Sequence, residues 1–304
     1  MPDLEVGAAP VTAPASGFRT VEATRLPRAL RAWSRIGRRV PIATRLRVTG
    51  RLSARLVASG QTYLGPGGIA FSIDHDDPFQ ATMLVGLYDP LVEAVLRRYT
   101  PPGGIVIDAG AHLGYFSLRV GRWVGPTGSV HAFECDPRLV PRLRHHVEIN
   151  GLDWVIVNDL GLADHSGQAS LSLPNQLGWA STIEGAWGAS QATAVTMTTL
   201  DEYAVANGLA PEQISFIKLD VEGSELQAIR GARNLLAVTS APVLVEFVPW
   251  RMRLQQQDPT DLLTLMNELG FDPWAPSWTR DGRLRLRPGA DSALGEDVLF
   301  LKRT

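Results

Sequence analysis

Residues 104–124, GIVIDAGAHLGYFSLRVGRWV, decide the fold that this sequence predicts. A short apolar run ends in Asp108, a turn containing Gly110 and Gly114 follows, and a helical pattern begins at once. Continuous apolar runs of this kind are typical of parallel strands that are buried on both faces of a sheet. The two glycines allow a tight turn and a close backbone approach, and the helix beyond them offers free amide donors at its N-terminus.

The same unit recurs along the rest of the chain. Short apolar runs alternate with helical patterns from residue 103 to the terminal stretch DVLFLKR. This alternation predicts an α/β fold with a mostly parallel sheet and helices on both faces. Residues 165–200 interrupt this alternation. GQASLSL and AVTMTTL are predicted strands, and the stretch between them has no regular period and holds Trp179 and Trp187.

Composition excludes several classes of protein. The 304 residues are 45% hydrophobic, with 29 Lys and Arg against 31 Asp and Glu, so wholesale disorder is excluded and no general attraction to nucleic acid is expected. The lone cysteine, Cys135, excludes an internal disulfide framework. No apolar run approaches the length of a membrane span, and the N-terminus does not resemble a secretion signal. We therefore expect a cytoplasmic protein.

Charge is unevenly distributed. Residues 21–58 hold ten arginines and one acid, a net charge of +9, which leaves −2 − 9 = −11 for the rest of the chain. Leu26, Leu30, Trp33 and Val40 recur between the arginines at near-helical spacing, which indicates a basic amphipathic helix. The favoured interpretation is that its apolar stripe packs on the main domain. The alternative is contact with a membrane surface or an anionic partner.

Three regions follow from these patterns. Residues 1–20, rich in Ala, Pro, Thr and Ser, are a predicted flexible tail. Residues 21–100 form a predicted basic extension of helices and strands, with short strands over 44–74 and a helix over 89–99. Residues 101–304 form the predicted main domain.

Acidic residues at strand ends point to a nucleoside. Glu134 ends the next apolar run, 26 residues after Asp108, where a carboxylate can accept hydrogen bonds from both ribose hydroxyls. A dinucleotide site would carry glycine two residues before Gly110, where this chain has Asp108. An anion there repels a pyrophosphate and suits a sulfonium or ammonium group. The pattern favours S-adenosylmethionine over NAD, and an NAD-dependent oxidoreductase is the alternative enzyme.

Four stretches extend this argument: VIDAGAHLGYFSL, HAFECDP, ISFIKLDVEGSELQAIRGA and PVLVEF. In this order and spacing they resemble the FkbM family of S-adenosylmethionine-dependent methyltransferases. The resemblance covers about residues 71–303, a length that is ordinary for a domain. The resemblance implies a Rossmann-like class I methyltransferase fold, with a seven-stranded sheet whose last strand is antiparallel. It also implies O-methylation of a small-molecule hydroxylated acceptor: a sugar, a glycolipid or a polyketide-type secondary metabolite.

The resemblance also assigns residues to the cofactor, S-adenosyl-L-methionine. It implies that Glu134 holds the ribose and that Asp159, where this family often has Asn, faces the adenine. Tyr88 and Asp89 would close over the methionine end. The expected cofactor-binding residues are Tyr88, Asp108, Gly110, Gly114, Glu134, Asp159 and Asp220.

Three residues are catalytic candidates. Asp220 and Glu246 end neighbouring apolar strands, where a carboxylate is costly to bury without a partner. Asp220 could take the proton of the acceptor hydroxyl directly or through His112 in the first loop. Asp220 and Glu222 could instead bind a divalent cation. Two acids without an identifiable third ligand favour a reaction without a metal.

Smaller predictions concern neighbouring side chains. We expect Lys218 to point away from Asp220, and Glu225 to stabilise the first turn of a helix. His145 and His146 are expected on the surface of a helix.

The last alternatives concern partners. A catalytically silent module that binds a partner through the basic extension remains the alternative from another class of protein. A homo-oligomer is also compatible with the sequence. Five tryptophans are candidates for packing at the rim of the site or for contact with the acceptor: Trp179, Trp187, Trp250, Trp274 and Trp278.

Overall fold

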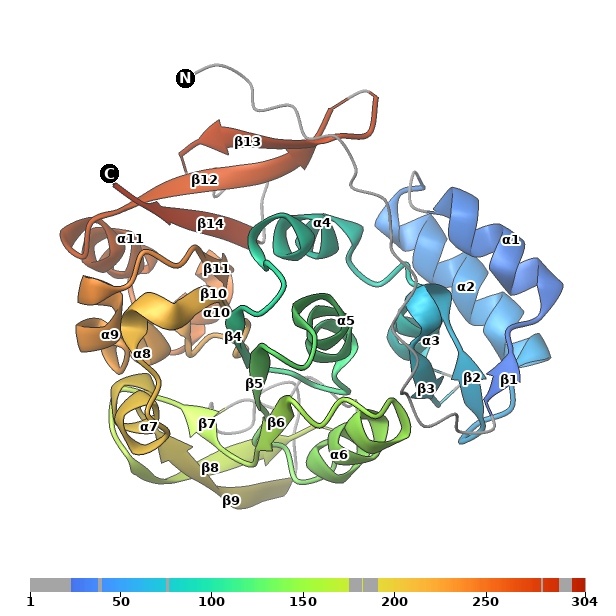
Figure 1. The fold of residues 1–304 in the computed structure, drawn as a ribbon, viewed down its shortest axis with the longest axis horizontal. Helices are drawn as coiled ribbons and strands as arrows, with labels where there is room; N and C mark the ends of the chain where they lie inside the picture. The colour runs from blue at the N-terminus through green and yellow to red at the C-terminus, as the bar shows by residue number, and fades with distance from the viewer. Residues whose placement is uncertain are drawn as a thin grey trace.

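A computed structural model describes residues 23–37, 40–74, 77–174, 182, 191–279, 281–289 and 297–303. Its centre is an eight-stranded sheet with the strand order β13-β12-β14-β11-β10-β4-β5-β6 (Figure 1). The strands are β4 (Ile105–Ala109), β5 (Ser129–Phe133), β6 (Val155–Asn158), β10 (Ile214–Leu219), β11 (Val243–Glu246), β12 (Phe271–Trp278), β13 (Leu284–Pro288) and β14 (Asp297–Lys302).

Strand directions confirm the predicted α/β fold with a mostly parallel sheet. Strands β6, β5, β4, β10 and β11 pair in parallel, and β14 lies antiparallel between β11 and β12. The resemblance implied seven strands, and the sheet has an eighth, β13, which pairs antiparallel with β12. Leu284 and Leu286 of β13 alternate with arginines and pack on the core, which is the period-two pattern of a strand with one buried face.

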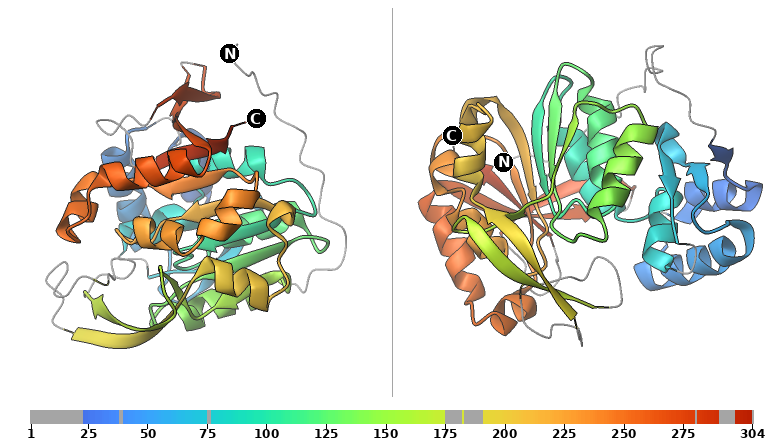
Figure 2. Two further views of the ribbon diagram at one scale, coloured as in Figure 1. Left: turned by 90° about the vertical axis from the view of Figure 1, so that its left-hand side faces the viewer. Right: turned by 90° about the horizontal axis from the view of Figure 1, so that it is seen from below.

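Helices cover both faces of the sheet (Figure 2). Neighbouring strand residues such as Val106 and Ile107 belong to two different hydrophobic clusters, one on each face. The first cluster includes α4 (Pro90–Tyr99), α5 (Tyr115–Val124) and α6 (Val140–Ile149). The second includes α7 (Leu200–Ala206), α8 (Glu225–Arg230), α9 (Arg233–Val238), α10 (Pro249–Leu254) and α11 (Pro259–Glu268).

The interrupting segment forms a small separate sheet. β7 (Gly161–Leu162), β8 (Gly167–Leu173) and β9 (Gln191–Thr198) pair in the order β7-β9-β8, which confirms the two predicted strands. A short helical turn, η4 (Pro211–Gln213), precedes β10. Trp179 and Trp187 lie outside the described residues.

The N-terminal extension differs from its prediction. It consists of β1 (Thr24–Arg25), α1 (Arg28–Ile36), α2 (Ile42–Leu56), β2 (Thr62–Leu64), η2 (Pro66–Gly68), β3 (Ala70–Ser72) and α3 (Pro78–Leu84). The strands predicted from residue 44 onward are wrong up to Leu56, because this stretch belongs to α2. The single basic helix is two helices, since Pro41 restricts Val40 and cannot continue a helix from it.

Packing of the extension on the main domain is confirmed. Leu26 and Leu30 are buried in the same cluster as the α4–α6 face of the sheet. Trp33 packs against this cluster and donates from Nε1 to Oγ1 of Thr49, 2.8 Å away. Contact of the arginines with a membrane or an anionic partner stays a prediction. In the described part of the chain, no helix is both long and apolar enough to cross a membrane.

His146 joins the extension to the main domain. The backbone N–H of Ser72 on β3 donates to its Nε2 at 3.2 Å, and its Nδ1 lies 2.9 Å from the carbonyl oxygen of Leu113. Burial lowers the pKa of His146 to about 4. The prediction that His146 lies on the surface is therefore wrong, because the extension covers this face of α6, whereas His145 is exposed as predicted.

Candidate active site

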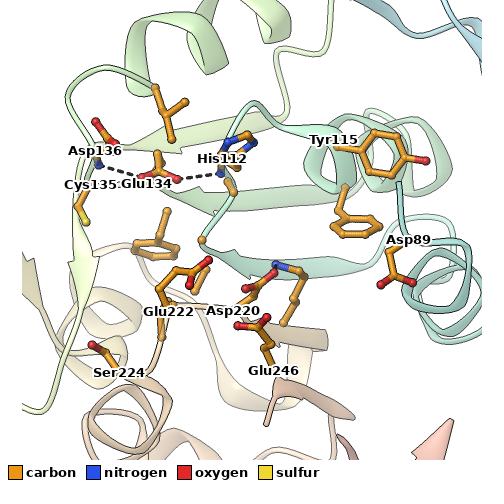
Figure 3. Close-up of a pocket in the computed structure, with 18 of the residues that line it drawn as sticks. Asp89, His112, Tyr115, Glu134, Cys135, Asp136, Asp220, Glu222, Ser224 and Glu246 are labelled. Atoms are coloured by element: carbon orange, nitrogen blue, oxygen red, sulfur yellow. Dashed lines mark hydrogen bonds and ion pairs between the residues drawn. The ribbon is translucent and has the colours of Figure 1, made fainter. Parts of the chain in front are cut away.

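A cavity of about 490 Å³ opens where the parallel strands β4, β5, β10 and β11 end (Figure 3). Open α/β sheets bind ligands at this edge, because the loops after the strands leave a crevice there. The core residues in the cavity wall include Gly110, His112, Glu134, Asp220, Glu222 and Glu246.

Gly110 is required by the contact between two loops. Its φ is +75°, and a Cβ atom there would lie 1.7 Å from the backbone oxygen of Asp220. Gly110 also lines the cavity, so its predicted cofactor contact stays a prediction. Gly114 does not line the cavity: it precedes α5 in a left-handed conformation, and its Cβ would meet Leu143 at 2.5 Å. Gly114 therefore allows close helix packing, and its predicted cofactor contact stays a prediction.

Glu134 is held in the cavity wall by two backbone amides. Its Oε2 accepts a hydrogen bond from the N–H of His112 and its Oε1 from the N–H of Asp136, both at 2.8 Å (Figure 3). Burial raises the pKa of Glu134 to about 7, although these amides act to lower it. The amide of Cys135 also stabilises this carboxylate, which leaves a lone pair free for a hydroxyl donor, so the site fits a ribose.

Lys218 lies between two carboxylates. Its Nζ is 3.3 Å from Oδ1 of Asp108 and 3.0 Å from Oδ2 of Asp220. Burial alone would lower the pKa of Lys218, but Asp220 and Asp108 raise it above its usual value. The prediction that Lys218 points away from Asp220 is wrong, because residues two apart on a strand share a face.

Asp108 is not part of the cavity wall. It is 3% exposed, and its Oδ2 accepts a hydrogen bond from Oγ of Ser117 at 2.5 Å. Burial raises the pKa of Asp108, whereas Lys218 and Ser117 act in the opposite direction. The structure therefore places Asp108 against Lys218, and its predicted contact with the cofactor stays a prediction.

Arg251 pairs with the other two carboxylates. Its Nη1 lies 2.9 Å from Oε2 of Glu222 and 2.6 Å from Oε2 of Glu246. Burial raises the pKa of Glu222 to about 8, against the effect of Arg251. Burial, with Asp220 and Glu222 close by, raises the pKa of Glu246 well above its usual value. Glu222 can therefore hold a proton near neutral pH.

The sequence indicated two candidate metal ligands, Asp220 and Glu222, and the structure adds a third acidic side chain, that of Glu246. One oxygen each from Asp220, Glu222 and Glu246 lies within 4.8 Å of the others, a spacing that could hold a divalent cation. Lys218 and Arg251, however, already pair with all three carboxylates. A metal ion would have to displace these two cations.

Two further loops border the cavity. Asp89 caps α4 by accepting hydrogen bonds from the amides of Leu91 and Val92, each at 3.0 Å. Tyr88 lines the cavity and also packs on Tyr115, with the ring centres 5.5 Å apart. Tyr88 thus combines packing with a place in the wall.

His112 and Asp159 have different positions. His112 lines the cavity in a left-handed conformation, with φ 54°, and burial lowers its pKa to about 4. Its Nδ1 is buried and has no hydrogen-bond partner among the residues that the structure describes. Asp159 is exposed and outside the wall, where Leu160, Gly161 and Leu162 lie instead.

Sequence reasoning missed a second set of lining residues. They belong to α2 and α3 of the extension and are Ile42, Ala43, Leu46, Phe79 and Met83. Their apolar spacing indicated only packing, and no motif in the extension marked them. Glu225 has the structural role that was predicted, because its Oε1 accepts from the amides of Val221 and Gly223 at 3.0 and 3.1 Å.

The strand order and the site at the strand ends define a Rossmann-like class I methyltransferase fold. The family model described as "Methyltransferase FkbM domain" matches residues 108–273, which is more than half of the chain. The chain belongs to the FkbM methyltransferase family. No curated protein matches it.

Three solved structures are similar at low identity. The methyltransferase FkbM of Methylobacillus flagellatus KT is 16% identical, with a TM-score of 0.38, and the match covers 86% of this chain and 59% of that one. The O-methyltransferase of Bacillus cereus, in complex with SAH, is 12% identical (TM-score 0.44; 90% and 97% covered). The SAM-dependent O-methyltransferase of Thermotoga maritima is 12% identical, with a TM-score of 0.41, and the match covers 81% of this chain and 79% of that one. These are distant likenesses, so the family assignment rests on the domain match.

Proposed function

We propose that this protein transfers a methyl group from S-adenosylmethionine to a hydroxyl group of a small-molecule acceptor. The observation that carries the proposal is the charge of the cavity. Two cations line it, Lys218 and Arg251, and both pair with carboxylates. The acids in its wall are Asp77, Asp89, Glu134, Asp136, Asp220, Glu222, Glu246 and Asp297. Glu134 and Glu222 can hold protons near neutral pH, but the other acids still outnumber the two cations. This excess of negative charge suits a sulfonium and ammonium ligand and opposes the pyrophosphate of a dinucleotide.

The residues present fit such a cofactor. Glu134 would accept hydrogen bonds from the ribose, while the amides of His112 and Asp136 keep its carboxylate in place. Tyr88 and Asp89 would border the methionine end. When bound, the cofactor supplies the electrophilic methyl carbon, and the chain must orient the acceptor oxygen and remove its proton.

Asp220 is the residue best placed to take that proton. Lys218 holds its Oδ2, so its Oδ1 is the atom that would accept the hydroxyl proton as the C–O bond forms and the C–S bond breaks. Glu222 and Glu246 lie close to Asp220 and complete the acidic end of the cavity. Lys218 and Arg251 balance part of the charge, so we propose a reaction without a metal.

Calorimetry with S-adenosylhomocysteine and with NAD tests the cofactor. We expect binding of the former alone. Glu134→Ala should weaken it by about 1.5–3 kcal/mol, the usual cost of losing hydrogen bonds to a charged group. Glu148→Ala, at an exposed position of α6, is the matched control. Tighter binding of NAD by the wild type would reject the proposal in favour of an oxidoreductase.

Turnover with a set of hydroxylated acceptors tests the base. Asp220→Asn should lower turnover by about 10²–10⁴-fold if Asp220 takes the proton, and the exposed Asp153→Asn should not. A chelator should leave activity unchanged. If a chelator abolishes activity and one divalent ion restores it, the carboxylates of Asp220, Glu222 and Glu246 would be assigned to a metal site. S-adenosylhomocysteine binding without turnover on any acceptor would favour a silent binding module.

A further inference from the structure

The extension supplies one wall of the cavity, and that wall is apolar. We call it the acceptor wall; it consists of Ile42, Ala43 and Leu46 of α2 with Phe79 and Met83 of α3. None of these residues lies within residues 108–273, the part that matches the family model. The acceptor wall is therefore separate from the matched part of the chain, which carries the strand ends expected to hold the cofactor.

The α2 part of the acceptor wall lies on the Asp89 side of the cavity. Arg45, also on α2, interacts electrostatically with Asp89 and Tyr115. Figure 3 shows Asp89 and Tyr115 on the side of the cavity opposite Glu134, with Asp220 and Glu246 between them. A ligand held at Glu134 thus has Asp220 and Glu246 in the middle of the cavity and α2 beyond them, whereas α3 begins at Asp77 near His112.

Part of the acceptor wall is not packed against protein. Ile42 is 54% exposed, Ala43 is exposed and Leu46 is half-buried, although all three line the cavity. Burying exposed apolar surface is favourable, and an apolar ligand in the cavity would bury these side chains. Met83 below them is buried, and a methionine side chain adapts to varied apolar shapes.

The same wall offers almost nothing to a hydroxyl group. Among the residues of 42–83 that the structure describes, Asp77 at the start of α3 is its one polar neighbour in the cavity. Its Oδ1 accepts from the amides of Phe79 and Gln80, and its Oδ2 accepts from Nε2 of Gln80 at 3.1 Å. A free sugar placed there would lose hydration without gaining hydrogen bonds, which is costly. An acceptor with an apolar body would not carry this cost.

We infer that the extension selects an amphiphilic acceptor, in which the hydroxyl that is methylated belongs to a polar head and an apolar body lies on Ile42, Ala43 and Leu46. The inference rests on the proposed function and narrows it. Lipid-linked sugars and polyketide-type molecules have this character, and free sugars do not.

Two glucosides test it with the intact protein. Glucose and octyl glucoside, the latter below its micelle concentration, share one head and differ only in the alkyl chain. Calorimetry is carried out first on the unliganded protein and then in the presence of S-adenosylhomocysteine. In both conditions we expect the Kd of octyl glucoside to be at least tenfold lower than the Kd of glucose. Ala43→Trp should fill the space at the wall and abolish this gain. Ala54→Trp, at an exposed position of the same helix outside the cavity, should keep it.

Ala43→Trp could fail to fold, and a loss of affinity for S-adenosylhomocysteine would reveal this. A second variant covers that case. Leu46→Glu places a charge in the same wall and should also abolish the gain, whereas Val205→Glu, at an 83% exposed apolar position on α7, should not. Equal affinities of the wild type for the two glucosides would overturn the inference, and so would a gain that survives both wall variants. Failure of the wild type to bind S-adenosylhomocysteine would instead reject the proposed function, since the glucosides are compared first without it.

Discussion

The methyltransferase core and the N-terminal extension differ in whether their charged side chains are paired or exposed. The core buries charged side chains in paired sets, such as Asp108–Lys218–Asp220 and Glu222–Arg251–Glu246. The extension has no acid at all between residues 23 and 57, and most of its described arginines, such as Arg28, Arg31 and Arg47, are exposed. Removing a charge should therefore matter greatly in the core and little in the extension.

Lys218→Met should have the largest effect on stability. The variant would leave Asp108, which is 3% exposed, without its cationic partner. Removing one member of a buried pair costs about 3–5 kcal/mol, because the remaining charge stays desolvated. Chemical denaturation of the unliganded protein measures it, with the exposed Arg253→Met as control. A loss as small as that of the control would show that this network adds little to stability.

These buried networks could be predicted only in part. The glycine turn and the carboxylates at the strand ends followed from the sequence, because each is a local pattern at the end of an apolar run. Their partners did not, because Arg251 comes from α10 and reaches Glu222 and Glu246 only in the folded chain. Asp108 was expected to face a ligand, since nothing local showed that Lys218 lies against it.

The contribution of Glu225 to stability should fall as the pH rises from 5 to 8. Burial raises the pKa of Glu225 to about 7 from its usual 4.5, so the folded state keeps a proton that the unfolded state loses. The unfolded state binds fewer protons in this range, and the stability present below pH 4.5 is lost as the pH rises through 7. A tenfold difference in proton affinity between the two states corresponds to about 1.4 kcal/mol, so the loss is on the order of a few kcal/mol.

Glu225→Gln isolates this contribution. Glutamine keeps an acceptor oxygen for the amides of Val221 and Gly223 but does not titrate. As the pH rises from 5 to 8, the thermal stability of the wild type should fall relative to that of the variant. Glu134 and Glu222, whose pKa values are also raised, keep part of the slope. An equal slope in both proteins would contradict the role of Glu225.

The extension was predicted less well than the core, for physical reasons. Its arginines and apolar residues alternate in a way that fits an amphipathic helix, and Leu26 and Leu30 are buried as that pattern indicated. The same pattern does not reveal where the helix is interrupted or what lies beyond its apolar face. The contribution of α2 to the cavity depends on how the extension packs against the core, which no local pattern specifies.

A single buried hydrogen bond should have a moderate effect in the extension. Thr49 is fully buried and accepts a hydrogen bond from Nε1 of Trp33, which joins α1 to α2. Thr49→Val removes this bond at nearly constant volume and should cost about 0.5–1.5 kcal/mol. Thr44→Val, at a half-buried position of α2, is the control in the same thermal unfolding experiment. Affinity for S-adenosylhomocysteine should not change, because neither threonine lines the cavity.

The smallest effect is expected from the exposed arginines. Arg47, Arg51 and Arg55 lie four residues apart on α2, and like charges at this spacing destabilise a helix by about 0.2–0.5 kcal/mol per pair. Replacing all three with Gln should therefore raise the thermal unfolding temperature slightly at low salt. The gain should disappear at higher salt, since exposed charges are screened within ~8 Å at physiological ionic strength. Destabilisation by the triple variant would show that these arginines have acidic partners. Salt-sensitive binding of acidic vesicles by the wild type, lost in the variant, would show that the basic face contacts a membrane.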